Sequence, residues 1–320
     1  MNAAVVTTFT APPSFTTFAD PTPQQEEKLV KVLAAGLHPI VRSLANGSHY
    51  GSTGQFPFIP GVDGVGRLED GTRVYFGGVR SPFGTMAELA LASPAMCLTL
   101  PDALDDATCA GIANPAMSGW VALTARAKFV AGETVLILGA TGSAGQMAVQ
   151  IAKRLGAARV IAAGRNPQAL EELKSLGADA VISLDQPHDA LVENIRSEWA
   201  VNGVNVVLDY LWGPPAEAVF EAIAQKGLQH ATSRVRHVQI GESAGRKISL
   251  PGSLLRSTAL EILGSGFGSA SFDQIRQAVT EFFAAAAVKP FHFEVKSAPL
   301  SDVAALWNTK EQGARLVFLP

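Results

Sequence analysis

The chain has 320 residues, of which 48% are hydrophobic and 17% charged, and its formal net charge is -3. This length predicts two domains, and the composition excludes a disordered chain. The small net charge excludes the basic surface typical of nucleic-acid and anionic-membrane binding, so small-molecule partners are expected. The start lacks a secretory pattern, no long apolar run occurs, and two cysteines cannot form a disulfide framework. A cytoplasmic protein outside the membrane is therefore predicted.

The first hundred or so residues carry short strand patterns separated by glycine and proline. The patterns are KLVKVLAAG, VGRLEDGTRVYFGG and FGTMAELALAS. In the second pattern Glu69, Asp70 and Gly71 lie between alternating apolar residues, which is typical of a hairpin. This part of the chain is therefore predicted to be a mostly antiparallel β domain.

From about residue 119 the pattern changes to strands and helices in strict alternation. Expected strands cover residues 134–139, 159–164, 179–184, 204–213, 235–241 and 260–266. Expected helices cover residues 146–156, 167–177, 189–200 and 216–227. Strands of nearly unbroken valine, isoleucine and leucine are buried on both faces, and glycines close the helices. The pattern predicts an α/β domain with a doubly wound parallel sheet.

The C-terminal part returns to a different pattern. A helix is expected over 272–287, a strand over 292–297, a helix over 300–309 and a last strand over 314–320. We expect this tail to rejoin the first domain.

A glycine-rich segment, GATGSAG at residues 139–145, lies at the first junction between strand and helix. Such a turn leaves the first amides of the helix unpaired at the positive end of its dipole, where a pyrophosphate can bind. In this interpretation Gly142 permits close approach of the backbone to the ligand, and Gly145 permits close packing of helix on strand. The alternative is a tight turn that binds nothing. The AxGxxG run comprises Ala140, Thr141, Gly142, Ser143, Ala144 and Gly145.

The end of the next expected strand indicates which dinucleotide binds. An NAD site usually places an acid there for the ribose hydroxyls, but this chain has Gly164, Arg165 and Asn166. Arg165 and Asn166 can donate hydrogen bonds to a 2′-phosphate, and Gly164 leaves room for that group. NADPH is therefore predicted rather than NADH. The alternative is that Arg165 is a solvated loop residue and Asn166 only caps the next helix.

Several segments in their order resemble the zinc-free branch of the medium-chain dehydrogenase/reductase superfamily, nearest to its NADPH-dependent quinone oxidoreductases and enoyl reductases. The resemblance implies a GroES-like β domain over residues 1–118, completed by 269–320, and a Rossmann dinucleotide-binding domain over 119–268. It places the active site in the cleft between them. The segments are KLVKVLAAGLHP, NGSHY, FPFIPGVDGVGRL, FGTMAELALA, GETVLILGATGSAGQMAVQIAKRLGA and GARLVFLP.

The metal ligands of the zinc-containing relatives are missing from this sequence. The segment Gly61-Val62-Asp63 stands where those relatives have a GHE-type histidine motif, and AAGLHP has no cysteine at the position of the other ligand. Two cysteines also cannot build a four-cysteine zinc lobe. We therefore predict an enzyme without a metal.

The resemblance implies further site residues. Tyr50 matches a tyrosine at the family's cleft, where its hydroxyl can bind a substrate carbonyl or donate a proton, with His49 and His38 as further candidates. His38 replaces the usual asparagine. Tyr50 could instead only line the pocket while solvent protonates the product. Cofactor contacts, which could equally be packing or turn residues, are implied for Ser118, Ile240, Gly241 and Gly264.

Together these features predict an NADPH-dependent oxidoreductase that reduces a quinone or an α,β-unsaturated carbonyl. The alternative is a protein that binds NADPH without turnover, as the lens crystallins of this family resemble. The last expected strand, ALEILGSG, is apolar apart from Glu261, and such a sheet edge favours pairing with a second copy. A homodimer is therefore predicted, without a nucleic-acid partner.

Overall fold

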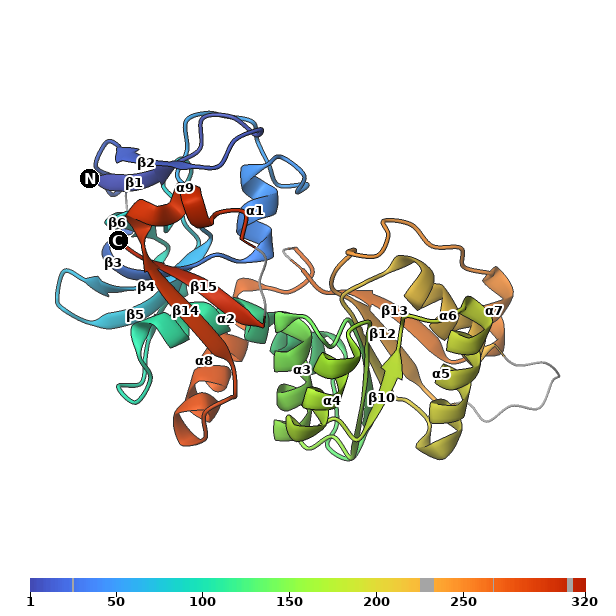
Figure 1. Ribbon diagram of the computed structural model, residues 1–320. Helices are drawn as coiled ribbons and strands as arrows, with labels where there is room; N and C mark the ends of the chain where they lie inside the picture. The colour runs from blue at the N-terminus through green and yellow to red at the C-terminus, as the bar shows by residue number, and fades with distance from the viewer. Residues whose placement is uncertain (25, 225–232, 267, 310–312) are drawn as a thin grey trace. The chain divides into compact units, whose positions relative to one another are not determined.

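The protein is described by a computed structural model at residues 1–24, 26–224, 233–266, 268–309 and 313–320. These residues form two compact units, Met1–Asn114 together with Thr280–Pro320, and Pro115–Val279 (Figure 1). The assignment of a substrate-binding role to one unit and a cofactor-binding role to the other stays a prediction. None of the helices in the described ranges is long and apolar enough to cross a membrane.

The first unit is built on a mostly antiparallel sheet, as predicted. Among the described residues seven strands pair in the order β14-β15-β3-β4-β5-β7, with β6 also on β3, while β1 and β2 form a separate pair. β14 and β15 run parallel to each other, and β15 pairs antiparallel with β3, which joins the tail to this sheet. The strands are β1 (Asn2–Val5), β2 (Ser14–Thr17), β3 (Lys28–Gly36), β4 (Asp63–Leu68), β5 (Arg73–Gly77), β6 (Leu89–Ala92), β7 (Cys97–Thr99), β14 (Glu294–Pro299) and β15 (Ala314–Leu319).

The predicted hairpin is confirmed between β4 and β5, which pair antiparallel with Arg67 opposite Arg73. Gly71 has a φ of +85°, a left-handed conformation that glycine adopts readily. The Asp70 carboxylate accepts a hydrogen bond from the Thr72 amide at 2.8 Å. The turn residues therefore fix the register of the two strands.

The helices of this part of the chain were harder to predict. The expected helix over 300–309 is a 3₁₀ turn, Leu300–Asp302, followed by the short helix α9 (Val303–Leu306). Sequence analysis missed α1 (Pro39–Ala45) and α2 (Asp106–Val121), whereas α8 (Phe272–Val288) was predicted. α2 continues through Pro115 and two glycines, which argue against a helix by propensity. A Cβ on one of them, Gly111, would lie 2.7 Å from a Val295 methyl, so close packing requires glycine there.

The second unit contains the doubly wound parallel sheet that the alternation predicted. Its six strands pair in parallel in the order β10-β9-β8-β11-β12-β13 among the described residues. The strands are β8 (Thr134–Leu138), β9 (Arg159–Gly164), β10 (Ala180–Ser183), β11 (Val206–Asp209), β12 (Val235–Gln239) and β13 (Leu260–Gly264). The helices are α3 (Ser143–Arg154), α4 (Pro167–Ser175), α5 (His188–Asn202), α6 (Gly213–Ile223) and α7 (Gly252–Ser257).

Helices cover both faces of this sheet, with α3 and α4 on one face and α5 and α6 on the other (Figure 1). The chain passes from β8 outward to β10, then returns to β11 and continues to β13, so the order reverses between β8 and β11. Ligands of such sheets bind beyond the carboxyl ends of the strands at this reversal. The end of the helix expected over 216–227 lies outside the described residues.

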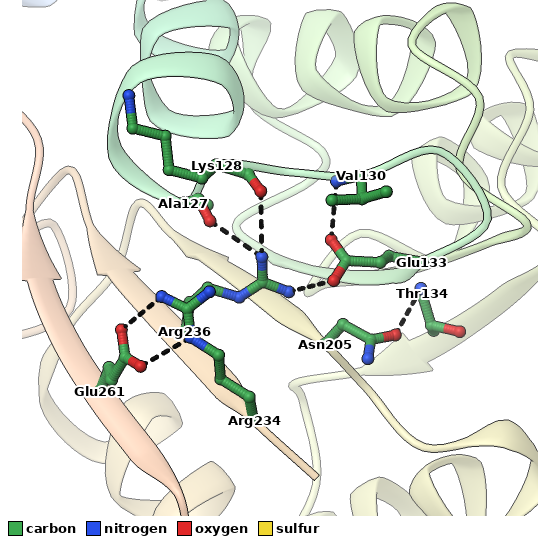
Figure 2. Close-up of polar contacts among 9 residues, drawn as sticks. All are labelled: Ala127, Lys128, Val130, Glu133, Thr134, Asn205, Arg234, Arg236 and Glu261. Carbon is green, nitrogen blue, oxygen red and sulfur yellow. Dashed lines mark hydrogen bonds and ion pairs between the residues drawn. The ribbon is translucent and has the colours of Figure 1, made fainter.

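At the opposite end of the sheet, where the strands begin, polar side chains bind the loop before β8 (Figure 2). The buried Arg236 guanidinium donates to the carbonyls of Ala127 and Lys128, at 2.9 and 3.3 Å, and pairs with the Glu133 carboxylate. Arg234, directly before β12, forms a two-bonded pair with Glu261 of β13, at 2.6 and 2.9 Å. This end of the sheet is therefore held by side chains on the strands and directly before them.

Candidate functional site

The glycine-rich turn joins β8 to α3. Gly139 follows β8 with a φ of +85°, and Gly142 occupies the N-cap of α3 with extended backbone angles. A Cβ on Gly145 would lie 2.3 Å from the carbonyl oxygen of Gly139, which no side chain could tolerate. Gly145 is therefore required by the close packing of α3 on the turn, as the sequence pattern predicted.

Gly142 differs from its two neighbours in the motif. Its φ of -80° suits any residue, and among the described atoms an added Cβ would meet only the Gly139 oxygen, at an ordinary 3.5 Å. Having no side chain, Gly142 also provides no cap for the amides of the first turn of α3. The protein's own packing thus does not explain glycine here, and the approach of a ligand to the helix end stays a prediction.

Gly164 ends β9 beside the same turn. A Cβ on Gly164 would lie 2.4 Å from Cγ2 and 2.9 Å from Oγ1 of Thr141. Sequence analysis explained this glycine by the space that a 2′-phosphate needs. The structure shows a packing reason for glycine here, the Thr141 side chain of the glycine-rich turn, and the phosphate site stays a prediction.

Asn166 is the N-cap of α4, and its Oδ1 accepts hydrogen bonds from the amides of Gln168 and Ala169 at 3.0 and 3.2 Å. Asn166 therefore caps α4, and its binding of a 2′-phosphate stays a prediction. Capping uses only the oxygen, and within the described part of the chain the Nδ2 group donates no hydrogen bond. Arg165 is exposed, and it has no hydrogen bond or ion pair with any residue the structure describes. Both side chains therefore keep hydrogen-bond donors that could bind an anion.

Ser118 lies in α2, where its hydroxyl donates to the Pro115 carbonyl at 2.8 Å and lies 3.3 Å from the Tyr210 hydroxyl. Burial raises the pKa of Tyr210 to about 12, so this phenol stays protonated at neutral pH. Sequence analysis missed Tyr210. Its position directly after β11, beside the reversal of strand order, was the signal that could have found it.

The remaining predicted cofactor residues follow the last two strands of the sheet. The amides of Ile240 and Gly241 both donate to the Asp209 carbonyl, at 2.7 and 3.1 Å. A Cβ on Gly241 would lie 2.6 Å from the Tyr210 carbonyl oxygen, so glycine is needed there. Gly264 ends β13, and its carbonyl accepts from Arg126 Nε at 2.7 Å. Apart from Ser118 in α2, the predicted cofactor residues of this unit therefore lie at or just after the carboxyl ends of the strands, with Gly264 at the end of β13.

Tyr50 lies in the first unit, in the loop after α1. Its side chain is 79% exposed, and its ring stacks on His49 with the centroids 4.1 Å apart. His49 Nδ1 in turn accepts a hydrogen bond from the Gly51 amide at 3.0 Å. The hydroxyl of Tyr50 is thus accessible, and its catalytic role stays a prediction.

His38, the other candidate of the first unit, is fully buried with its Nε2 3.3 Å from Oδ1 of Asp63. The other carboxylate oxygen of Asp63 accepts from the Tyr75 hydroxyl at 2.7 Å. Burial, reinforced by Asp63, holds the pKa of Tyr75 well above its ordinary value. These contacts place His38 in the interior of its unit, in a polar cluster with Asp63 and Tyr75.

No three histidine, cysteine or acidic side chains gather into a possible metal site in the ranges that the structure describes. Cys97 and Cys109 are unpaired thiols, and burial raises the pKa of Cys109 to about 12. The metal-free state stays a prediction.

Comparison with known proteins adds an independent line of argument. A sequence family described as zinc-binding dehydrogenase matches residues 144–285. A probable NADPH-dependent quinone reductase of Emericella nidulans is 30% identical over 357 aligned positions, which cover the whole of both chains. An NADPH-dependent alkenal/one oxidoreductase of Arabidopsis thaliana is 29% identical over 175 positions, 50% of this chain and 45% of that protein.

The fold has counterparts among solved structures. The quinone oxidoreductase of Thermus thermophilus, solved alone and in complex with NADPH, superimposes with a TM-score of 0.78 and 26% identity over the full length of both chains. The parallel and antiparallel sheets, the glycine-rich turn and the full-length similarity agree with one another. The chain therefore belongs to the medium-chain dehydrogenase/reductase superfamily, among the proteins similar to quinone oxidoreductases and enoyl reductases.

Proposed function

We propose that this protein is an NADPH-dependent oxidoreductase that reduces a quinone or an α,β-unsaturated carbonyl without a metal. One observation supports this most directly. The uncapped end of α3 at Gly142 and the donors of Arg165 and Asn166 lie at the ends of neighbouring strands. A full-length relative carries the name of an NADPH-dependent quinone reductase, which agrees with that arrangement.

The residues fit the two phosphate groups of NADPH. The start of α3 suits the pyrophosphate, because it is the positive end of the helix dipole and the N-cap residue Gly142 provides no side-chain cap there. The Arg165 guanidinium suits the 2′-phosphate, with the Nδ2 group of Asn166 as a second donor. The structure gives neither of these donors another partner in the described ranges.

Bound NADPH supplies a hydride, and the acceptor must also gain a proton. A quinone or conjugated carbonyl accumulates negative charge on an oxygen as it is reduced, and a hydrogen-bond donor stabilises that charge. We assign this role to the exposed hydroxyl of Tyr50, either as the proton donor or as a donor to an oxygen that solvent protonates. Val62, where the zinc relatives have a histidine, offers no ligand atom.

The partners follow from the same proposal. The acceptor is a small molecule, as expected for this family. A homodimer through β13 is part of the proposal, because β13 is the last strand of its sheet and pairs with β12 on one side. The cytoplasmic location stays a prediction.

The proposal is tested by following NADPH oxidation with a panel of quinones, enones and enals in the presence of a metal chelator. At least one acceptor should be reduced at the rate seen without chelator, and NADP-linked oxidation of simple alcohols should be negligible. Activity that disappears with chelator and returns with zinc would contradict the metal-free mechanism. NADPH binding without turnover of any acceptor would favour the crystallin-like alternative.

A further inference from the structure

A buried carboxylate and imidazole lie beneath the edge where the candidate cofactor residues gather. Asp209 ends β11, His237 lies in the neighbouring strand β12, and both side chains are fully buried. His237 Nε2 and Asp209 Oδ2 are 2.8 Å apart, and the imidazole is the donor because a carboxylate only accepts. Sequence analysis proposed no role for either residue.

The other oxygens of Asp209 organise the turns that follow two strands. Oδ1 accepts from the amides of Leu211 and Trp212 at 2.8 and 2.9 Å, which fixes the turn after β11. The main-chain carbonyl accepts from Ile240 and Gly241, the residues that follow β12. One buried residue thus holds both turns at the carboxyl ends of adjacent strands.

The turn that Asp209 holds has an unusual backbone. Trp212 has a φ of +55°, a left-handed conformation that residues other than glycine adopt rarely, and Gly213 follows with a φ of +60°. The Trp212 ring packs edge-on against His237 and Phe220, with centroids 5.9 and 6.4 Å away. Such a conformation persists only where the surroundings hold it. Here the hydrogen bonds to Asp209 and the packing on the His237 and Phe220 rings do so.

The same turn contacts the glycine-rich turn. A Cβ on Gly139 would lie 3.0 Å from a Leu211 methyl and 3.3 Å from the Cβ of Tyr210, so these side chains lie against Gly139. On the other side, the Leu211 carbonyl accepts from the Ala244 amide at 2.8 Å. The turn at residues 210–213 therefore lies between the glycine-rich turn and the segment that follows β12.

We propose that Asp209 and His237 form a positioning pair that holds residues 210–213 in the conformation that binds the pyrophosphate and nicotinamide portion of NADPH. The inference rests on the proposed function, since it assumes that NADPH binds at this edge. Neither side chain is exposed, so the pair acts through the turn and does not touch the cofactor. The proposed 2′-phosphate donors, Arg165 and Asn166, follow β9 and form no hydrogen bond or ion pair with this turn within the described residues.

The test compares two ligands on purified variants. His237→Phe keeps a ring of similar size between Trp212 and Phe220 but removes the donor to Asp209. NADPH affinity should fall by about 10-fold to 100-fold, because a buried charged acceptor loses its partner and the turn its support. Affinity for adenosine 2′-monophosphate, which carries the adenosine and the 2′-phosphate without the pyrophosphate and the nicotinamide, should change by less than about 2-fold.

Two further variants complete the comparison. His237→Gln offers an amide donor at the reach of Nε2 and should restore NADPH affinity to within about 5-fold of the wild type. His188→Phe is the matched control, because His188 Nε2 also pairs with a carboxylate, Glu221 at 2.9 Å, but on the exposed surface of α5 and α6. It should leave both affinities unchanged.

Unchanged NADPH affinity in His237→Phe, or equal losses for both ligands, would overturn the positioning role. If His237→Phe does not fold, His237→Gln and the shorter His237→Asn make the same comparison, and equal NADPH affinities in those two variants would overturn it. A wild-type protein that binds no NADPH would instead contradict the proposed function.

Discussion

Replacement of Arg165 by alanine tests the residue to which we assign the preference for NADPH over NADH. Arg165 is exposed and has no partner among the described residues, so its removal breaks no internal bond. The substitution should therefore lower the affinity for the ligand and leave the stability of the protein unchanged. A charge-assisted hydrogen bond to phosphate contributes about 1.5 to 3 kcal/mol, which corresponds to a roughly 10-fold to 150-fold weaker NADPH complex. Exposure to solvent favours the lower end of this range.

The affinity for NADH should change little in Arg165→Ala, because NADH has no 2′-phosphate. The assay is a fluorescence titration of each nucleotide at low and high salt, and the wild-type preference for NADPH should shrink as salt screens the charge. Arg196→Ala is the matched control, since Arg196 is another exposed arginine of the same unit, paired with Glu193 on α5. Equal affinities of the wild type for NADPH and NADH would refute the assignment of the 2′-phosphate site.

Three further predictions follow from the geometry. Gly142→Ala should unfold at nearly the wild-type temperature but bind NADPH more weakly, and normal NADPH binding by this variant would argue against a phosphate at that turn. Gly145→Ala should lower the unfolding temperature, because its Cβ would lie 2.3 Å from a carbonyl oxygen. Tyr50→Phe should slow the reduction of conjugated carbonyls by about 10-fold to 1,000-fold and that of quinones less, without loss of stability because the side chain is exposed; unchanged steady-state rates would remove Tyr50 from the mechanism. Sedimentation at micromolar concentration should give twice the chain mass, and a persistent monomer would contradict pairing through β13.

The sequence predicted the parallel sheet well because its signals are local. Unbroken apolar strands, glycines at helix ends and the AxGxxG run all occur within short windows of the chain, and the fold and the family are confirmed. α2 was missed because Gly111 and Pro115 argue locally against a helix, and the packing on Val295 that explains Gly111 is remote in sequence. Tertiary contacts of this kind override propensity.

The buried pair shows the same limit within the candidate site. Asp209 and His237 are 28 residues apart, and their contact depends on the order of strands in the sheet. The expected strand over 204–213 stops at Asp209 because its carboxylate binds the amides of the turn that follows. The packing of the Thr141 side chain against Gly164 likewise became visible only in three dimensions.

The oxygen and the nitrogen of the Asn166 side chain differ in their contacts, and this difference has an evolutionary consequence. Its oxygen caps α4, while its nitrogen faces no described partner. Aspartate presents the same capping oxygen and caps helices equally well, yet it replaces the second donor with an acceptor that suits ribose hydroxyls. With the proposed 2′-phosphate site, a change of cofactor preference through position 166 would keep the cap of α4, and paralogues that prefer NADH are expected to differ there.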